Sequence, residues 1–316
     1  EQYDDKLIIV SRNGDINISD FDKIENKKPE FLNIKSNLNF EYILDTLVFE
    51  NDIYISGKNI DGEKTFIEIV KGKFNEKNIQ FESIMKLEGE NCILSYSVHS
   101  GKIQMYNDDG SKFLVSINSA GRKDEPTMET LSPDSICGKI LLVDSKDKTF
   151  EVFSSGHRNI IGLYADQNVI LSTEHGPQAG DEINKIEKGK KYGWPVASYG
   201  EKYKRDKSNL EPTYKKNHKQ NGFEEPIFSF IPAIGISEII KLPNKFSNLW
   251  QDNFLVASLN GKYLYRIKFD ENYNKIIYFE PIYIGDRIRD LIYNDDKNKI
   301  YLALELEGAI GIISKK

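Results

Sequence analysis

The sequence contains very little cysteine: Cys92 and Cys137 are the only two in 316 residues. Neither belongs to a CxxC motif or lies beside a cluster of histidines, which excludes a structural zinc site and a thioredoxin-like redox motif. The two cysteines leave two alternatives open, one disulfide or two buried thiols.

Long apolar runs and helical periodicity are also missing. No run of 18 apolar residues occurs, so no segment spans a bilayer as a helix, and we expect a soluble protein. The first residues, EQYDDK, have neither the charged nor the apolar region of a signal peptide. No stretch shows the apolar period of 3.6 residues that the crossover helices of an α/β fold need. We therefore predict an all-β protein.

An excess of positive charge is absent as well. The chain carries 43 basic and 49 acidic residues, a net charge of −6. Proteins that bind nucleic acid need a concentrated basic face. We therefore exclude nucleic acid as a partner.

What the chain does contain is a series of short β-type runs, such as KLIIV (6–10), KFLVSI (112–117) and YLYRIKF (263–269). Turn dipeptides separate them: Asn13-Gly14, Asp61-Gly62, Asp109-Gly110 and Asn260-Gly261. About twenty to twenty-four strands in four-stranded sheets give five or six blades of about fifty residues. Six blades fit 316 residues best. We therefore predict that residues 1–316 form a single six-bladed β-propeller domain.

Arginine is scarce, and its placement is informative. Lysine supplies 36 of the 43 basic residues and arginine only seven, three of which lie in GHRN (156–159) and RIRD (287–290). The planar guanidinium fork suits carboxylates and phosphates better than an ammonium does. Together with EHGP (174–177), these motifs predict one polar ligand pocket.

RIRD places Arg287 and Arg289 two residues apart in a strand, so both side chains project from the same face. Their charges repel unless a carboxylate lies between them, supplied by the protein or by a ligand. Two interpretations stay open: a surface ladder neutralised by Asp286, Asp290 or a neighbouring blade, or a clamp for an anionic ligand.

GHRN follows the β-type run TFEVF, where Gly156 releases a strand into a loop. We interpret His157 as a packing or turn histidine rather than a base. Arg158 and Asn159 are the better site candidates.

The segment 171–195 combines acidic residues with a Gly-Pro turn. Glu174, Asp181 and Glu182, with the carbonyls of that turn, make the all-oxygen environment that calcium prefers. An ordinary acidic turn is the alternative. The segment 200–226, rich in Lys, Asn and Glu, is interpreted as a solvated surface loop rather than a binding element.

His99 ends the run CILSYSV and precedes Ser100-Gly101, a strand-to-turn position that suits the mouth of a propeller. A lone histidine there is more often structural than catalytic. The neighbouring motifs make it a candidate for catalysis.

In this order, the segments resemble the soluble quinoprotein sugar dehydrogenases, the glucose/sorbosone dehydrogenase family that uses pyrroloquinoline quinone (PQQ). The resemblance extends over nearly the whole chain. It is carried by IIVSRNGDINI (8–18), VHSGKIQMYNDDGSKFLVSIN (98–118), CGKILLVD (137–144), GHRNIIGL (156–163), EHGPQAGDEINKIEKGKKYGWP (174–195) and DRIRDLIYNDDKNKIYLAL (286–304).

The resemblance implies a six-bladed propeller with PQQ on its broad face, over the central channel. It implies that His99 is the general base that takes the proton from the anomeric hydroxyl of a sugar. It further implies that Arg158 and Asn159 contact the cofactor near its quinone oxygens, Arg158 taking part in catalysis as well.

The same resemblance implies that Arg287 and Arg289 clamp the cofactor's carboxylates and that the backbone carbonyls of Gly176 and Pro177 hold a catalytic Ca²⁺. It implies a sugar substrate, a separate electron acceptor, and a periplasmic or secreted location, because the family is exported. This chemistry is consistent, since PQQ is a tricarboxylate and calcium polarises a quinone as a Lewis acid.

Several positions depart from the pattern that the resemblance implies. Asn260 stands where a lysine is expected, Ala233 where a hydroxyl residue is expected, and Lys102 where a second glycine is expected. The leading hypothesis is a PQQ- and calcium-dependent oxidoreductase that oxidises an aldose to its lactone. The alternatives are a non-catalytic propeller that retains part of the anion pocket and a calcium-dependent propeller lactonase.

Overall fold

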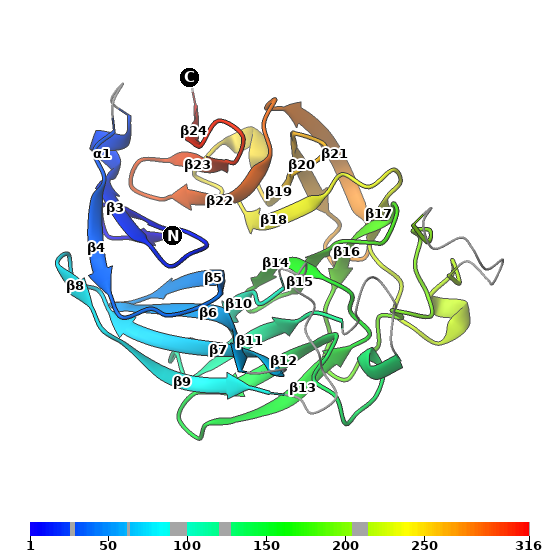
Figure 1. Ribbon diagram of the computed structural model, residues 1–316. Helices are drawn as coiled ribbons and strands as arrows, with labels where there is room; N and C mark the ends of the chain where they lie inside the picture. The colour runs from blue at the N-terminus through cyan, green and yellow to red at the C-terminus, as the bar shows by residue number, and fades with distance from the viewer. Residues whose placement is uncertain (26–28, 62–63, 89–99, 120–127, 204–213, 316) are drawn as a thin grey trace.

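The computed structural model describes all residues except 26–28, 62–63, 89–99, 120–127, 204–213 and 316. Its strands form six sheets arranged around a centre, a six-bladed β-propeller (Figure 1), which confirms the predicted fold class. In the described part of the chain the one α-helix is α1 (Phe21–Ile24).

The first three blades are formed in chain order. The first contains β1 (Gln2–Tyr3), β2 (Lys6–Val10), β3 (Ile16–Asp20) and β4 (Leu32–Ser36), with β8 (Asn78–Ile79) parallel to β4. The second contains β5 (Tyr42–Phe49), β6 (Asp52–Asp61), β7 (Lys64–Lys73) and β9 (Phe81–Leu87). The third contains β10 (Ile103–Met105), β11 (Lys112–Ile117), β12 (Lys139–Asp144) and β13 (Thr149–Ser155).

The remaining three blades follow the same order. The fourth contains β14 (Ile160–Ala165), β15 (Ile170–Glu174), β16 (Asp181–Lys185) and β17 (Phe228–Phe230). The fifth contains β18 (Ile236–Lys241), β19 (Asn253–Ser258), β20 (Tyr263–Phe269) and β21 (Ile276–Tyr283), and the sixth contains β22 (Ile288–Asn294), β23 (Lys299–Leu304) and β24 (Ala309–Ser314). Short 3₁₀ turns lie at Met128–Thr130, Lys219–Asn221 and Asn248–Trp250.

The core of the protein lies between neighbouring blades. Leu171 and Ile183 of the fourth blade, for example, pack in one buried cluster with Ile239 and Val256 of the fifth. Successive side chains of a pleated strand point to opposite faces of its sheet. Each face of a blade packs against the blade beside it, so apolar side chains on both faces are buried.

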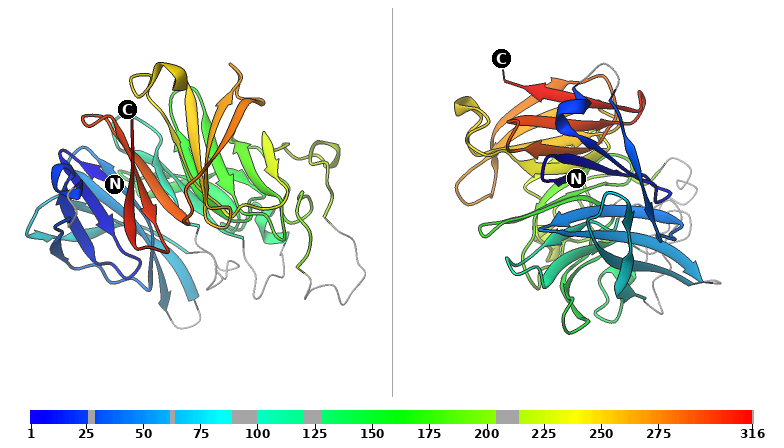
Figure 2. Two further views of the ribbon diagram at one scale, coloured as in Figure 1. Left: turned by 90° about the horizontal axis from the view of Figure 1, so that it is seen from above. Right: turned by 90° about the vertical axis from the view of Figure 1, so that its left-hand side faces the viewer.

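Side chains close the ring between its first and last blades, which lie side by side in Figure 2. Phe21 of α1 packs on Tyr301 of β23 with their ring centroids 4.8 Å apart. The Nζ of Lys299 lies 2.6 Å from Glu25 Oε1, and Lys297 pairs with Asp22.

A β-bulge occurs at the same place in four innermost strands. The register shifts by one residue after Ile43 in β5, Ile160 in β14, Ile236 in β18 and Ile288 in β22. Bulges re-aim side chains and occur often beside functional sites. Here they accompany polar residues on the inner strands, among them Asp45, Glu238 and Arg289.

The centre of the ring is closed by charged groups. The Nζ of Lys102, next to β10, lies 2.5 Å from Asp45 Oδ1 of the second blade and 2.6 Å from Glu238 Oε2 of the fifth. Burial alone lowers the pKa of Lys102, but the carboxylates of Asp45 and Glu238 raise it well above its ordinary value. Lys102 therefore links three blades as a cation.

Consecutive strands of each blade are antiparallel, so successive connections alternate between the two faces of the propeller. One face therefore carries the connections from one blade to the next and the connections from the second to the third strand of each blade. We call this side the loop face. It carries 156–159, 175–180, 231–235, 259–262, 284–287 and 305–308.

The turn predictions hold in part. Gly14 and Gly110 have φ of +94° and +67°, as their dipeptides predict, but in the Asn260-Gly261 turn Lys262, not Gly261, has positive φ (+58°). Gly62 lies outside the described residues. Cys137 is disulfide-bonded, which decides against a pair of buried thiols; Cys92 lies outside the described residues.

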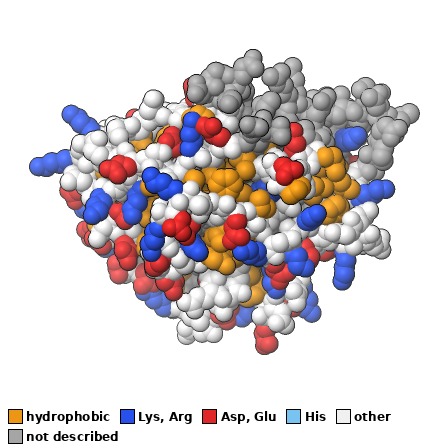
Figure 3. Space-filling model, turned by 90° about the horizontal axis from the view of Figure 1, so that it is seen from below, with side chains coloured by type: hydrophobic (Ala, Val, Ile, Leu, Met, Phe, Trp, Pro, Cys, Tyr) orange, Lys and Arg blue, Asp and Glu red, His pale blue; other side chains and the backbone are white. Residues whose placement is uncertain are grey.

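The surface carries both signs of charge. In Figure 3 acidic and basic side chains are interspersed around apolar patches. Phe150 and Val152 on the edge strand β13 are exposed. Within the described ranges, no helix has the length and apolar character needed to cross a membrane.

Candidate functional site

His157 lies in the loop that joins β13 to β14 and is completely buried. Its Nε2 lies 2.8 Å from Ser154 Oγ and its Nδ1 3.2 Å from Glu174 Oε2. Its ring stacks on Tyr192 at 4.7 Å between centroids. The structure therefore agrees with the sequence interpretation of His157 as a packing residue.

Arg158, the next residue, is held by hydrogen bonds at its backbone and at its guanidinium group. Its backbone N–H donates to Glu174 Oε1, and its Nη1 donates to the His175 carbonyl at 2.9 Å. The guanidinium lies over the Trp194 ring, 5.3 Å from the centroid. A guanidinium has five N–H donors. Within the described residues most of them are unused, so Arg158 can bind a further anion.

Asn159 carries an unsatisfied polar atom. Its backbone carbonyl accepts from the N–H of His175 at 2.9 Å, and its Nδ2 lies 3.5 Å from His175 Nδ1. Its Oδ1 is buried and has no hydrogen-bond partner among the described residues. Buried polar atoms are almost always satisfied, so this oxygen suits a water molecule or a ligand donor.

His175 is the residue on which the site converges, and sequence reasoning did not single it out. Its Nε2 donates to the Ile236 carbonyl at 2.6 Å, which ties the fourth blade to the fifth. Burial lowers its pKa, Asp181 opposes this, and the positive charges of Arg158 and Arg289 lower it further. The guanidinium groups of Arg158, in the loop before β14, and of Arg289, on β22, thus act on one imidazole although they lie far apart in the sequence. The EHGP motif was the available signal.

The Gly176-Pro177 turn is tight. A Cβ on Gly176 would lie 2.2 Å from the Gly180 carbonyl, so only glycine fits. The N–H of Gly176 donates to Asp181 Oδ1 at 3.1 Å. The carbonyls of Gly176 and Pro177 accept no hydrogen bond within the described part of the chain. They are therefore available to a cation.

The Asp181 carboxylate, unlike these carbonyls, already accepts hydrogen bonds from the protein and is not free to bind a cation. Its Oδ2 accepts from the N–H groups of Ile234 and Ile236, both at 3.0 Å, which fixes the fifth-blade loop against the EHGP turn. Among the residues that the structure describes, no cluster of three or more His, Cys, Asp or Glu side chains is placed to hold a metal. Any calcium on this turn would depend on backbone carbonyls and water.

Arg287 and Arg289 share one carboxylate, and the protein supplies it. Arg287 Nε lies 3.1 Å from Glu305 Oε2, and Arg289 Nη2 donates to the same oxygen. The partner is therefore neither Asp286 nor Asp290, which sequence reasoning named. It comes from the connection between β23 and β24 of the same blade.

His99 lies outside the described residues, but the chain directly after it is held firmly. Ser100 Oγ donates to the Ile160 carbonyl at 2.8 Å, and Ser56 Oγ donates to the Gly101 carbonyl at 2.5 Å. Gly101 has φ of +141°. The second, third and fourth blades therefore meet at this segment.

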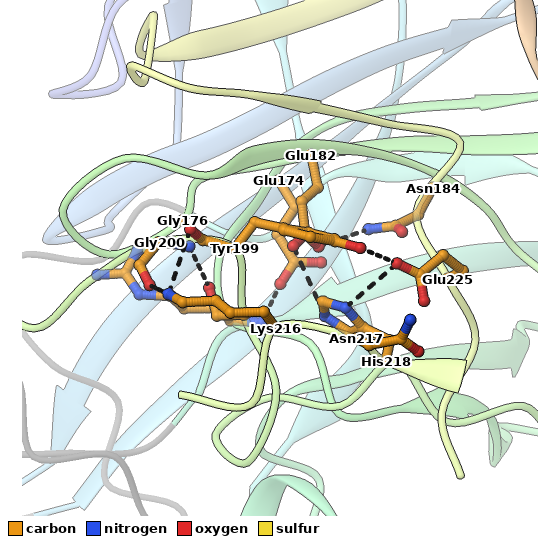
Figure 4. Close-up of polar contacts among 12 residues, drawn as sticks. Glu174, Gly176, Glu182, Asn184, Tyr199, Gly200, Lys216, Asn217, His218 and Glu225 are labelled. Atoms are coloured by element: carbon orange, nitrogen blue, oxygen red, sulfur yellow. Dashed lines mark hydrogen bonds and ion pairs between the residues drawn. The ribbon is translucent and has the colours of Figure 1, made fainter. Parts of the chain in front are cut away.

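The described part of segment 200–226 is not a merely solvated loop, which corrects the sequence interpretation. Tyr214 is buried against Trp194, with 5.1 Å between ring centroids. His218 is buried as well, and its Nε2 lies 3.7 Å from Glu182 Oε1 (Figure 4). Burial, with the nearby charge of Glu174, raises the pKa of Glu182 well above its ordinary value.

A pocket of about 10 Å³ lies beneath the loop face, lined in part by Arg158, Glu174 and Trp194. This volume holds about one water molecule. A planar polycyclic group therefore cannot lie in it.

The departures from the family pattern lie on the same face. Asn260 donates its backbone N–H to the Ile234 carbonyl at 2.9 Å, and its side chain is exposed. Ala233 lies in the adjoining loop, next to Ile234.

These features define the molecule as a six-bladed propeller with Arg158, Arg287 and Arg289 in or beside the loops of one face. The chain belongs to the glucose/sorbosone dehydrogenase family, whose model matches residues 3–311.

Two named curated relatives are sugar dehydrogenases. The aldose sugar dehydrogenase YliI of Escherichia coli is 30% identical over 240 residues, 71% of this chain and 62% of the relative. The quinoprotein glucose dehydrogenase B of Acinetobacter calcoaceticus is 26% identical over 209 residues, 50% of this chain and 44% of the relative. An uncharacterized Synechocystis protein is 31% identical over 67% of this chain and 45% of its own length. The chain thus spans about half the length of these relatives.

Solved structures share the fold. A crystal structure of glucose dehydrogenase superposes with a TM-score of 0.80 at 21% identity, over 100% of this chain and 94% of that one. The PQQ-bound aldose sugar dehydrogenase of Streptomyces coelicolor gives 0.63 at 17% identity, over 94% and 91%.

Proposed function

We propose that this protein is a PQQ- and calcium-dependent oxidoreductase that oxidises the anomeric hydroxyl of an aldose, giving the lactone. The observation that carries the proposal is the Arg158 guanidinium, which the His175 carbonyl holds at 2.9 Å on the loop face with most of its N–H donors unused among the described residues. Arg287 and Arg289, which share the Glu305 carboxylate in the free protein, add two more guanidinium groups for a cofactor that bears three carboxylates. The family membership and the quinoprotein among the relatives support the same conclusion.

The residues present fit the cofactor chemically. Each arginine offers a planar fork for a carboxylate, and the buried, unpaired Oδ1 of Asn159 offers an acceptor beside them. The carbonyls of Gly176 and Pro177 offer calcium two hard oxygen ligands. When bound, PQQ would supply the redox chemistry, polarised by the calcium ion.

The protein's own groups have separate roles in this proposal. Arg158 orients the cofactor and stays in place because Trp194 and the His175 carbonyl hold its guanidinium. We assign proton removal from the sugar hydroxyl to His99, on the family resemblance. The anchored Ser100 and Gly101 fix the chain next to this base.

We propose further that residues 1–316 act as one domain in the periplasm or outside the cell, passing electrons to a separate acceptor. A non-catalytic propeller is the second candidate. It is favoured by one observation, that Glu305 already neutralises part of the Arg287/Arg289 pair. Asn260, in place of a cationic lysine, points in the same direction.

Incubating the purified protein with Ca²⁺ and PQQ tests the proposal. We expect sugar-dependent reduction of an artificial electron acceptor, and a higher Tm with PQQ because a ligand of the folded state stabilises it. Arg158→Lys keeps the charge but loses the fork, and should lower the activity by about tenfold or more. Arg266→Lys, on β20 of the fifth blade, is the matched control and should leave the activity unchanged.

His99→Ala separates the candidates further, since it should abolish turnover while PQQ stays bound. A rise in Tm without turnover in the unmodified protein would favour the non-catalytic propeller. No rise in Tm and no reduction with any aldose would end the PQQ proposal, whereas lactone hydrolysis with calcium alone would indicate a lactonase.

A further inference from the structure

The Arg287/Arg289 pair binds a carboxylate even without a ligand. Arg287 Nε lies 3.1 Å from Glu305 Oε2, and Arg289 Nη2 donates to the same atom. Two cations and one anion leave this group with a net charge of +1. The single oxygen of Glu305 therefore occupies the place where a ligand carboxylate would bind.

Glu305 is held in this position by its backbone. Its own N–H donates to the Arg287 carbonyl at 2.9 Å. The Asp286 carboxylate accepts from the N–H groups of the two following residues, Leu306 at 2.9 Å and Glu307 at 3.0 Å. The turn after β23 is thus fixed to the loop before β22, and Glu305 is preorganised between the two arginines.

The side chains of this group are only partly buried. Arg287, Arg289 and Glu305 expose 30%, 45% and 37% of their side chains. Ion pairs in such surroundings are individually weak. An incoming carboxylate can therefore exchange with Glu305, which can turn toward solvent without leaving a buried charge.

We propose that Glu305 is a built-in competing carboxylate, which keeps the arginine pair ordered in the free protein and lowers its affinity for a polycarboxylate ligand. This inference rests on the proposed function for the identity of the natural ligand, PQQ. It assigns to Glu305 the control of cofactor affinity at that site.

Glu305→Gln tests the inference, because it removes the charge and keeps the shape. Two probes are used in equilibrium titrations of the full chain: PQQ with Ca²⁺, and trimesate, a redox-inert aromatic tricarboxylate. Because two weak ion pairs are lost, we expect Kd to fall by on the order of tenfold for both probes.

Glu280→Gln is the matched control. Glu280 pairs with Arg266 Nε at 2.9 Å on the outer edge of the fifth blade and exposes 43% of its side chain. The substitution removes the same charge from the protein but leaves the Arg287/Arg289 pair unchanged. Its Kd for both probes should equal that of the unmodified protein.

An equal or weaker affinity of Glu305→Gln would overturn the inference, since Glu305 would then only support the arginines. If Glu305→Gln has lost thermal stability, Glu305→Ala repeats the test with the same two expectations. Tighter binding of trimesate but no binding of PQQ would uphold the competing carboxylate and refute the proposed cofactor. Binding of neither probe to any variant would refute both.

Discussion

Two lysines of the third blade, Lys102 and Lys139, are both withdrawn from solvent, but their ammonium groups have different partners: carboxylates for Lys102 and backbone carbonyls for Lys139. Lys102, at the centre of the ring, contacts carboxylates of two other blades at 2.5 and 2.6 Å. Lys139, on β12, donates to the backbone carbonyls of Thr130 at 2.6 Å, Cys137 at 2.9 Å and Glu129 at 3.1 Å.

The different partners move the two pKa values in different directions. Burial lowers the pKa of Lys139 to about 8, because carbonyl dipoles compensate only part of the lost hydration. At Lys102 the carboxylates of Asp45 and Glu238 overcome the effect of burial and raise the pKa. The comparison shows that the propeller uses full charges to join distant blades and dipoles to fix a loop within one blade.

Lys102→Met gives the largest expected effect. It leaves Asp45 and Glu238 buried without their counter-charge, which should lower the free energy of unfolding by about 3 kcal/mol. Urea unfolding at neutral pH measures the loss. The double variant Lys102→Met/Asp45→Asn should recover part of it, and a loss below about 1 kcal/mol would show that the ion pairs do not join the blades.

Lys139→Met should cost less, about 1–2 kcal/mol, because it removes three hydrogen bonds to backbone carbonyls but leaves no unpaired charge, and the carbonyls of Thr130 and Glu129 keep backbone donors. The same urea experiment measures it. A loss equal to or larger than that of Lys102→Met would break the distinction between the two lysines.

A third expected effect is a pH dependence of stability, of which only a part falls within the pH range of an ordinary unfolding experiment. Because Lys139 has a pKa of about 8 in the folded protein and about 10.4 in the unfolded chain, the unfolded chain binds more protons between these values. The free energy of unfolding should therefore rise with pH across this window. Unfolding at several pH values should show this rise in the unmodified protein relative to Lys139→Met. A constant difference between the two would contradict the lowered pKa.

The sequence predicted the middle strands of the blades better than most of the innermost ones. KFLVSI and YLYRIKF coincide with β11 (Lys112–Ile117) and β20 (Tyr263–Phe269). β5, β14 and β18 were not among the recognised β-type runs, and of β22 only its start, in RIRD, was interpreted as a strand. Each contains a bulge that breaks the alternation of apolar and polar residues on which recognition depends. The strands hardest to predict therefore border the candidate site.

At the candidate site, the kind of group that an arginine pair needs was easier to predict than the residue that supplies it. The need for a carboxylate between Arg287 and Arg289 followed from charge repulsion, but its source, Glu305, depends on a turn that only tertiary structure brings near. The packing role of His157 was clear from its motif. The burial of Tyr214 and His218 was not, because their polar neighbours in sequence suggest a solvated loop.

The central claim is that the loop face binds PQQ and calcium between Arg158, Gly176 and Arg287. A crystal structure of the protein grown with both tests it most directly. We predict a planar tricyclic ligand over the ring centre, with carboxylates on the arginines and a cation on the carbonyls of Gly176 and Pro177. A saturated crystal in which PQQ binds elsewhere, or in which the loop face stays free of it, would contradict the account.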